Sequence, residues 1–448
     1  MSFPKDFVWG AAAASHQIEG ARDKRGKSVW DMFCEKENTV WNKQNGDVAC
    51  DHYHRYEEDV ALMGDLGLKA YRMSISWPRV LPDGIGAINA EGLAFYDRLV
   101  DCLLARGIKP WITLFHWDLP LALYRTGCWN NRDIASAFGD YAGILADRLG
   151  DRVSHWMTFN EPQCFIGLGS HQGGIAPGDK LAIAEALNMG HNMLLAHGKA
   201  IQALRARCKI PTVLGYAPMA GVFYPAKAGA AHEAAAIRAM LEIKSDGLWN
   251  NTWWMDPVYL GHYPEDGLVA YGANAPKVLP GDFDIIHQPL DFAGVNIYFG
   301  TPVIDVDGVK TEKINFSQGF PITSCVWQVV PEALYWGPKF LWERYKLPVV
   351  ITENGLTNPD WVSLDGKVHD PQRIDFTQRY LRELRRASDD GIKVAGYFYW
   401  SIMDNFEWSE GYKHRFGLIH VDYPSQRRTP KDSYYWYQEV IRTNGENL

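Results

Sequence analysis

The sequence lacks the closely spaced cysteine pairs that mark a disulfide framework or a structural zinc site. Its seven cysteines are an odd, scattered set without any CxxC pair. No apolar run reaches the length needed to span a membrane. The first residues have no basic region followed by a long apolar one, so no signal peptide is expected. These absences predict a protein of the reducing cytoplasm with no membrane partner.

The sequence also lacks an excess of basic residues. Lysine and arginine number 45 against 53 aspartates and glutamates, for a net charge of −8, whereas nucleic-acid binding needs clustered cations. The densest basic stretch, residues 382–386, includes Glu383 and follows a helical pattern, which favours a solvated helix face. There is no Walker-type loop, and Gly167-x-Gly169 lacks a third glycine. We therefore expect neither a nucleic-acid partner nor a nucleotide cofactor.

Two segments resemble metal-binding motifs only in part. His52 and His54 have no third ligand at a useful spacing. Residues 305–308, Asp-Val-Asp-Gly, begin like a calcium loop, but position twelve is Phe316 where a glutamate is needed. A tight turn is the better interpretation of that segment. The sequence therefore predicts no metal ion.

Aromatic residues are what the chain has in abundance. Eighteen tryptophans and 22 tyrosines help to bring the aromatic fraction to 13%, and many of them stand beside polar residues. Sugars present flat C–H faces and hydroxyl edges, and amphipathic rings suit both. A tryptophan-rich core would explain the same composition, so only the motifs can decide between the two interpretations.

Short apolar runs alternate with helical patterns along the chain. Several runs are almost continuously apolar, as in parallel strands buried on both faces. Residues 92–107 and 181–204 have the apolar spacing of helices. Eight alternations predict an α/β fold, a single (β/α)₈ TIM barrel over residues 1–448, with long βα loops near 17–55 and 299–347. The predicted strands are 7–15, 69–76, 109–116, 154–160, 212–218, 291–298, 348–353 and 393–401.

Polar residues collect where these predicted strands end, which is where catalytic residues of such barrels lie. Glu161 closes the fourth strand and Glu353 the seventh, each after an apolar run. Glycoside hydrolysis needs a pair of carboxyl groups, one to attack or to activate water and one to protonate the leaving oxygen. A single glutamate at a strand end is more often a helix-cap neighbour or part of a rim salt bridge. Two in matching contexts favour the catalytic interpretation.

The same segments resemble glycoside hydrolase family one, the β-glucosidase family, in its bacterial type. Asn160-Glu161-Pro162 is similar to the acid/base signature of that family, and Ile351-Thr352-Glu353-Asn354-Gly355 to its nucleophile signature. The resemblance spans nearly the whole chain in order. Its other segments are Phe7-Val-Trp-Gly through Gln17-Ile-Glu-Gly20, Tyr71-Arg72-Met-Ser-Ile-Ser-Trp77, His116-Trp-Asp-Leu-Pro120, Asp291-Phe-Ala-Gly-Val-Asn296, Trp400-Ser-Ile-Met-Asp-Asn-Phe-Glu407-Trp408 and Arg415-Phe-Gly through Tyr435-Trp436-Tyr437.

This resemblance implies a retaining, exo-acting β-glycosidase, a β-glucosidase without cofactor or metal. Its substrates would be small β-glucosides and cello-oligosaccharides, as in cellulose degradation, with β-fucosides and β-galactosides as further substrates. Glu353 would be the nucleophile and Glu161 the acid/base. The nucleophile would be supported by Arg72, Asn296 and Tyr298. The sugar would be bound by Gln17, His116, Trp117, Asn160, Trp327, Trp400, Glu407 and Trp408.

The chain departs from the family pattern around the expected aglycone side. Gly169-Ser170 stands where Gly-Tyr is common, and Trp327-Gln328 where Trp-Glu is common. These differences bear on the acceptor and leave the catalytic pair intact.

Three alternatives remain. A 6-phospho-β-glycosidase typically lacks an acid at the position of Glu407, a thioglucosidase has Gln in place of Glu161, and an inactive sugar-binding barrel would lack a carboxylate. The glutamates at 161, 353 and 407 disfavour all three.

Overall fold

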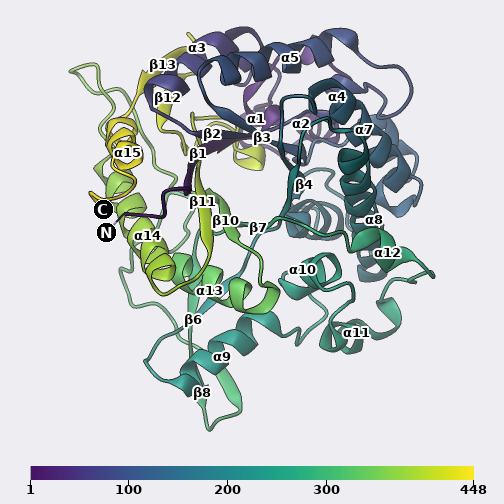
Figure 1. Ribbon diagram of the computed structural model, residues 1–448, viewed down its shortest axis with the longest axis vertical. Coiled ribbons are helices and arrows are strands. Elements are labelled where there is room, and N and C mark those ends of the chain that lie inside the picture. The colour runs from purple at the N-terminus through teal and green to yellow at the C-terminus, as the bar shows by residue number, and fades with distance from the viewer. Residues whose placement is uncertain (1) are drawn as a thin grey trace.

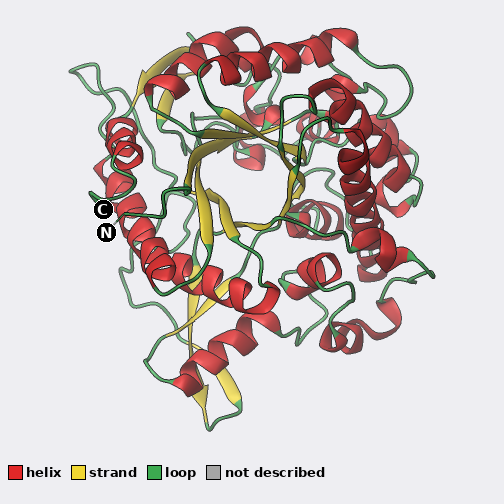
Figure 2. Cartoon of the chain, in the orientation of Figure 1, coloured by secondary structure: helices red, strands yellow, loops and turns green. Residues whose placement is uncertain are grey.

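The computed structural model describes residues 2–448 and contains a closed barrel of parallel strands (Figures 1 and 2). The strands follow one another around the barrel in the order β1-β11-β10-β7-β5-β4-β3-β2. The predicted (β/α)₈ barrel is confirmed, because each predicted strand overlaps one barrel strand. The barrel strands are β1 (Val8–Ala13), β2 (Ala70–Ser74), β3 (Lys109–Phe115), β4 (His155–Asn160), β5 (Val213–Ala217), β7 (Phe292–Asn296), β10 (Val349–Asn354) and β11 (Val394–Trp400).

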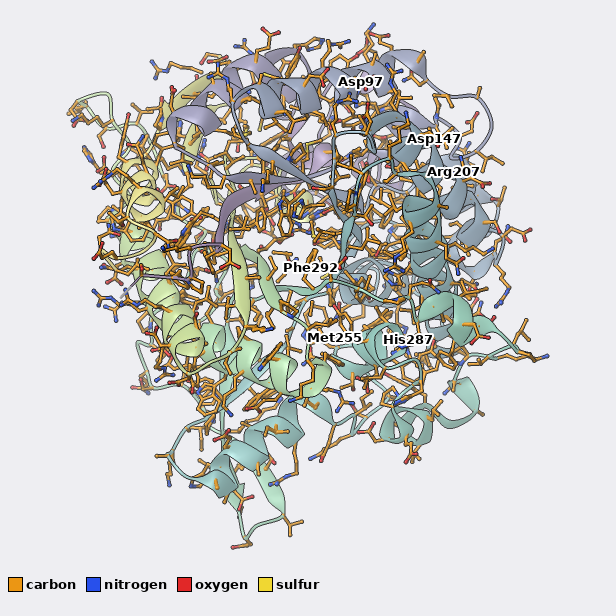
Figure 3. The ribbon with its side chains drawn as sticks, viewed as in Figure 1. Asp97, Asp147, Arg207, Met255, His287 and Phe292 are labelled. Atoms are coloured by element: carbon orange, nitrogen blue, oxygen red, sulfur yellow. The ribbon has the colours of Figure 1, made fainter. Side chains whose placement is uncertain are left out.

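Large aromatic side chains fill the interior of the barrel near the beginnings of its strands. The ring of Phe292, labelled near the barrel axis in Figure 3, lies 5.2 Å from that of Trp111, which lies 5.0 Å from that of Phe398. Gly215 and Gly10 leave the space these rings need, since a Cβ there would stand 2.3 Å from Phe292 and 2.4 Å from Phe398. The barrel is therefore a packed core at this end, and the opposite end is left for a site.

Amphipathic helices cover the outside of the barrel (Figure 2). In α5 (Ala90–Ala105) the buried residues include Phe95, Leu99 and Leu103, which recur at helical spacing and face the strands. The predicted helices at 92–107 and 181–204 correspond to α5 and to α8 (Ile183–Arg207), and residues 382–386 lie in α14 (Pro371–Asp389), as expected. The other principal helices after barrel strands are α3 (His52–Asp65), α7 (Ile134–Leu149), α8 (Ile183–Arg207), α13 (Ala333–Tyr345), α14 (Pro371–Asp389) and α15 (Asp432–Arg442).

Exposed ion pairs join neighbouring helices on the outer surface. Arg207 of α8 contacts Asp147 of α7 at 2.8 Å, and both are labelled on the outer layer in Figure 3. Such exposed pairs contribute at most about 1 kcal/mol each. The helix layer is therefore held mainly by its apolar faces.

The long connections are more structured than the sequence suggested. The predicted loop at 17–55 contains α2 (Val29–Glu35), and the one at 299–347 contains the hairpin of β8 (Gly300–Val306) and β9 (Lys310–Lys313). That hairpin turns at Asp307 and Gly308, with φ of 58° and 77°, which confirms the predicted tight turn.

A third long connection, between β5 and β7, was not anticipated. It contributes β6 (Val222–Pro225), which pairs with β8 in a three-stranded sheet outside the barrel, and it also holds four α-helices. These are α9 (Ala230–Leu241), α10 (Thr252–Tyr259), α11 (Glu265–Tyr271) and α12 (Asp282–Ile286).

The remaining elements are short. None of the helices in residues 2–448 is both long and apolar enough to cross a bilayer. The short elements are the strand pair β12 (Ile419–Asp422) and β13 (Arg427–Pro430), the α-helices α1 (Ser15–Ile18), α4 (Trp77–Val80) and α6 (Leu121–Arg125), the 3₁₀ helices η1 (Arg22–Lys24), η2 (Trp41–Lys43), η3 (Cys128–Asn130), η5 (Gly272–Asn274) and η6 (Trp408–Glu410), and the π-helix η4 (Gln163–His171).

Candidate active site

A cavity of about 500 Å³ lies at the C-terminal ends of the barrel strands and brings most of the predicted site residues together. Of the thirteen residues predicted for the site, nine line the cavity. They come from the ends of five barrel strands, β3, β4, β7, β10 and β11, or from the segments that follow, so closure of the barrel is what gathers them. The nine are His116, Trp117, Glu161, Tyr298, Trp327, Glu353, Trp400, Glu407 and Trp408.

The other four predicted residues, Gln17, Arg72, Asn160 and Asn296, lie directly behind the lining. All four are buried, with at most 1% of their surface exposed, and each makes a hydrogen bond to a residue of the cavity wall. Their present contacts are thus with the wall rather than with the cavity.

Glu353, at the end of β10, is held by two strong donors. Arg72 Nη1 donates to its Oε1 at 2.5 Å, and the Tyr298 hydroxyl donates to its Oε2 at 2.6 Å. Burial raises the pKa of Glu353, while the Arg72 cation and the Tyr298 hydroxyl oppose that rise. With both oxygens bound by donors that favour the anion, this carboxylate is fixed in position.

Glu161, directly after β4, has weaker donors. Asn296 Nδ2 donates to its Oε1 at 2.8 Å, and the Cys164 thiol donates to its Oε2 at 3.2 Å. Burial and the negative charge of Glu353 raise the pKa of Glu161 to about 7. Near neutral pH this carboxyl can therefore both give and take a proton.

Backbone irregularities direct both glutamates into the cavity. The register of β10 against β7 shifts between Ile351 and Glu353, and that of β4 against β5 shifts before Asn160. Glu161 itself has a φ of 45°, in the left-handed region that residues with a side chain seldom adopt. Bulges and such backbone angles are common at active sites, where they redirect a side chain.

Asn296 lies between the two glutamates. The sequence linked Asn296 to Glu353, but its amide donates to Glu161 Oε1 and to Asn160 Oδ1, at 2.8 and 3.0 Å. It still lowers the pKa of Glu353, so it acts on both carboxyl groups. Thr352 donates to Asn296 Oδ1 at 2.6 Å and fixes which way the amide faces.

Aromatic rings form one wall of the cavity. The His116 ring stacks on Trp400 at 5.6 Å and on Trp408 at 5.9 Å, and Trp408 contacts Trp117 at 4.7 Å. Burial and the charge of Arg72 lower the pKa of His116 well below its ordinary value, so its ring is neutral near pH 7. Flat rings beside polar edges suit the apolar face of a sugar.

Glu407 adds a third carboxyl group to the cavity wall. Gln17 Nε2 donates to Glu407 Oε2 at 3.3 Å, and burial together with the charge of Glu353 raises the pKa of Glu407 to about 8. The loop that precedes Glu407 is anchored by the buried carboxylate of Asp404, which accepts hydrogen bonds from Lys431 at 2.8 Å and from Arg415 at 2.6 Å. The Gln17 Oε1 acceptor is buried and has no hydrogen-bond partner among the described residues.

Several lining residues escaped the sequence reasoning. Cys164 stands three residues after Glu161, a spacing that brings two residues to one side of a helical turn and could have flagged it. Met219 and Trp249 belong to the connection that was not anticipated, and Phe299 follows Tyr298. These three also line a neighbouring cavity of about 480 Å³ that contains none of the three glutamates.

The cavity wall formed by residues 2–448 presents no cation. Within residues 2–448 its lining includes no lysine or arginine, and no cluster of three or more His, Cys, Asp or Glu side chains is arranged to hold a metal ion. His52, considered above as half of a metal motif, binds Asp59 at 2.7 Å instead. The cavity therefore presents an anchored carboxylate, Glu353, beside two carboxyl groups with raised pKa values, Glu161 and Glu407.

The chain is similar to known proteins over almost its whole length. The model of the family described as glycosyl hydrolase family 1 matches residues 1–446. The chain is 42% identical to β-glucosidase A of Thermotoga maritima over 99% of this chain and 98% of that one. It is 39% identical to an aryl-phospho-β-D-glucosidase of Bacillus subtilis over 100% and 98%. A solved β-glucosidase from Thermotoga maritima in complex with glucoimidazole has a TM-score of 0.90 and 41% identity, over 99% of both chains.

Proposed function

Because the chain belongs to glycosyl hydrolase family 1, we propose that it is a retaining, exo-acting β-glucosidase. One observation carries the proposal: Glu161 and Glu353 face the same cavity, but only Glu353 is bound by a cation. A pair of carboxyl groups so differentiated can divide the work of glycoside hydrolysis. The named relatives that are β-glucosidases support the substrate.

In this mechanism Glu353 attacks the anomeric carbon while Glu161 gives its proton to the departing oxygen. The carbon–oxygen bond to the aglycone breaks, and a covalent glycosyl-enzyme forms on Glu353. That step removes the charge of Glu353, which had raised the pKa of Glu161. Glu161 can then take a proton from water, which attacks the anomeric carbon and releases the sugar with its configuration retained.

The remaining polar groups are proposed to bind the terminal sugar. Trp400 would lie under its apolar face, and the hydroxyls would reach Glu407, His116 and the free acceptor of Gln17. Asn160 Nδ2 is hydrogen-bonded to the His116 ring at 3.0 Å, and we propose that it binds a sugar hydroxyl in addition to that ring. Trp117, Trp408 and Trp327 would complete the wall, the last toward the aglycone.

A 6-phospho-β-glucosidase is the second candidate, because one relative bears such a name. A phosphate needs cations, yet the lining formed by residues 2–448 has neither lysine nor arginine and does carry Glu407. The plain sugar is therefore favoured. We extend the substrates to cello-oligosaccharides, β-fucosides and β-galactosides, and we place one catalytic domain over residues 1–448 in the cytoplasm, where seven unpaired cysteines suit a reducing medium.

The test compares 4-nitrophenyl β-glucoside with its 6-phosphorylated form, while NMR follows the anomer released first. We expect turnover of the plain glucoside and initial release of the β-anomer. Preference for the phosphorylated compound would instead assign the protein as a 6-phospho-β-glucosidase. Initial release of the α-anomer would exclude a retaining mechanism. Failure to hydrolyse any β-glycoside would mean that the barrel is catalytically inactive.

A further inference from the structure

The thiol of Cys164 is bound directly to the proposed acid/base. Cys164 is 5% exposed and lines the cavity, and its Sγ donates to Glu161 Oε2 at 3.2 Å. The other oxygen of Glu161 receives the amide of Asn296 at 2.8 Å. The thiol is therefore the only side-chain donor on Oε2 within the part of the chain that the structure describes.

Local chain geometry brings this thiol to the carboxyl group. The left-handed backbone at Glu161 turns the chain after β4, and the backbone N–H of Cys164 donates to the carbonyl of Glu161 at 3.0 Å. The π-helix η4 begins at Gln163, and π-turns of this kind recur at functional sites. The contact is thus made within four successive residues.

A thiol is a weak hydrogen-bond donor, unlike the guanidinium and hydroxyl groups on Glu353. A strong donor on Oε2 would stabilise the ionised form of Glu161, which cannot protonate a leaving group. Resting on the proposed function, we propose that Cys164 is a positioning residue whose thiol orients Glu161 and, as a weak donor, leaves that carboxyl able to hold its proton.

The proposal predicts a different pH profile of activity for each substitution at Cys164. In Cys164→Ala the donor to the carboxylate is lost, so the pKa of Glu161 should rise. In Cys164→Ser a hydroxyl, the stronger donor, should restore the pKa or bring it below the wild-type value. The other charged or titratable groups that face Glu161 and Cys164 are the same in all variants, namely Arg72 from β2, Tyr298 after β7, Glu353 on β10 and Glu407 after β11.

The experiment measures kcat/KM against pH with cellobiose, whose sugar leaving group needs the proton. The alkaline limb reports loss of the proton from Glu161. We expect Cys164→Ala to move this limb upward by about half a pH unit, roughly threefold in proton affinity. Cys164→Ser should lie at or below the wild-type limb. Cys128→Ser is the matched control, since Cys128 is also buried but lines a different cavity, and its limb should not move.

Each outcome of this experiment either supports the proposal or overturns it. An unmoved or lowered limb in Cys164→Ala, a limb in Cys164→Ser as high as in Cys164→Ala, or an equal shift in Cys128→Ser overturns the proposal. If Cys164→Ala does not fold, the pKa of Glu161 in Cys164→Ser is measured instead, by NMR titration of protein that contains ¹³C-labelled glutamate. A pKa of Glu161 above the wild-type value then contradicts the role, and one at or below it supports the role. Failure of the proposed function looks different, because the wild-type protein itself would not hydrolyse cellobiose.

Discussion

The ends of β4 and β10 are alike in sequence, since each is an apolar strand closed by a polar residue and a glutamate, but they differ in the donors they meet. Glu353 receives a guanidinium and a hydroxyl at 2.5 and 2.6 Å, whereas Glu161 receives an amide and a thiol at 2.8 and 3.2 Å. Both carboxyl groups are buried, and the stronger donors on Glu353 distinguish it from Glu161, whose pKa is raised by burial and by the charge of Glu353.

The most severe way to break this comparison is to remove the anchored carboxylate. In Glu353→Gly no glycosyl-enzyme can form, and we expect hydrolysis to fall by more than about 10⁴-fold. Azide or formate should restore turnover from the vacated space, and azide should give the α-glucosyl azide. Release of 4-nitrophenol with and without azide, together with NMR of the product, measures both effects. Substantial activity without azide in a folded variant would place the nucleophile elsewhere.

Removing the other carboxyl group should produce a loss that depends on the leaving group. In Glu161→Ala, cellobiose should lose about 10²–10⁴-fold, because its leaving sugar needs a proton. A nitrophenolate leaves unaided, so the intermediate should accumulate, with a burst and a low apparent KM. Azide should now attack the intermediate and yield the β-glucosyl azide, the opposite anomer to that from Glu353→Gly. Equal losses on both substrates and no azide effect would contradict the acid/base role.

A smaller effect comes from exchanging the donors on Glu353. Arg72→Met removes the cation, so the pKa of Glu353 should rise and the acid limb of kcat/KM should move upward by about 1–3 pH units. Tyr298→Phe removes a neutral donor and should move the same limb less. Profiles with an aryl β-glucoside give both values. An acid limb that stays in place in Arg72→Met would show that the cation does not set the ionisation of Glu353.

The smallest expected effect is on stability. Folding raises the pKa of Glu161 to about 7 and that of Glu407 to about 8, from an ordinary value of 4.5. Their contribution to stability is therefore full below about pH 4.5 and is lost as pH rises through 7 to 8. Glu407→Gln should show a shallower decline of Tm than the wild type between pH 5.5 and 8.5, by on the order of 2 °C. Parallel declines in thermal melts would show that Glu407 titrates normally.

The alternation of apolar strands and helices was enough to predict the barrel, because parallel strands buried on both faces leave a clear sequence pattern. The same reasoning placed Glu161 and Glu353 on one rim. The strand pattern alone did not distinguish the two glutamates, since donors such as Arg72 on β2 and Tyr298 after β7 come from distant parts of the chain. Only the resemblance to family one assigned their roles and linked Arg72 and Tyr298 to Glu353.

Other features of the site depend on tertiary structure and leave little trace in the sequence. The register shift beside Glu353 arises from how β10 pairs with β7, and the left-handed backbone of Glu161 is fixed by its surroundings. Trp249 reaches the cavity from the connection between β5 and β7, which was not anticipated. Strand-end positions are thus predictable, while the exact direction of each side chain is not.

The cavity is lined by the carboxyl groups of Glu161, Glu353, Glu407 and Glu410 and, within residues 2–448, by no lysine or arginine, so it should hold protons that it can release when a cation binds. With pKa values of about 7 and 8 for Glu161 and Glu407, the empty cavity keeps protons at neutral pH. A sugar mimic with a positive nitrogen at the anomeric position would stabilise the ionised carboxylates, so protons should pass to the buffer on binding. Calorimetric heats should then vary with the ionisation enthalpy of the buffer, and the slope would count the protons released.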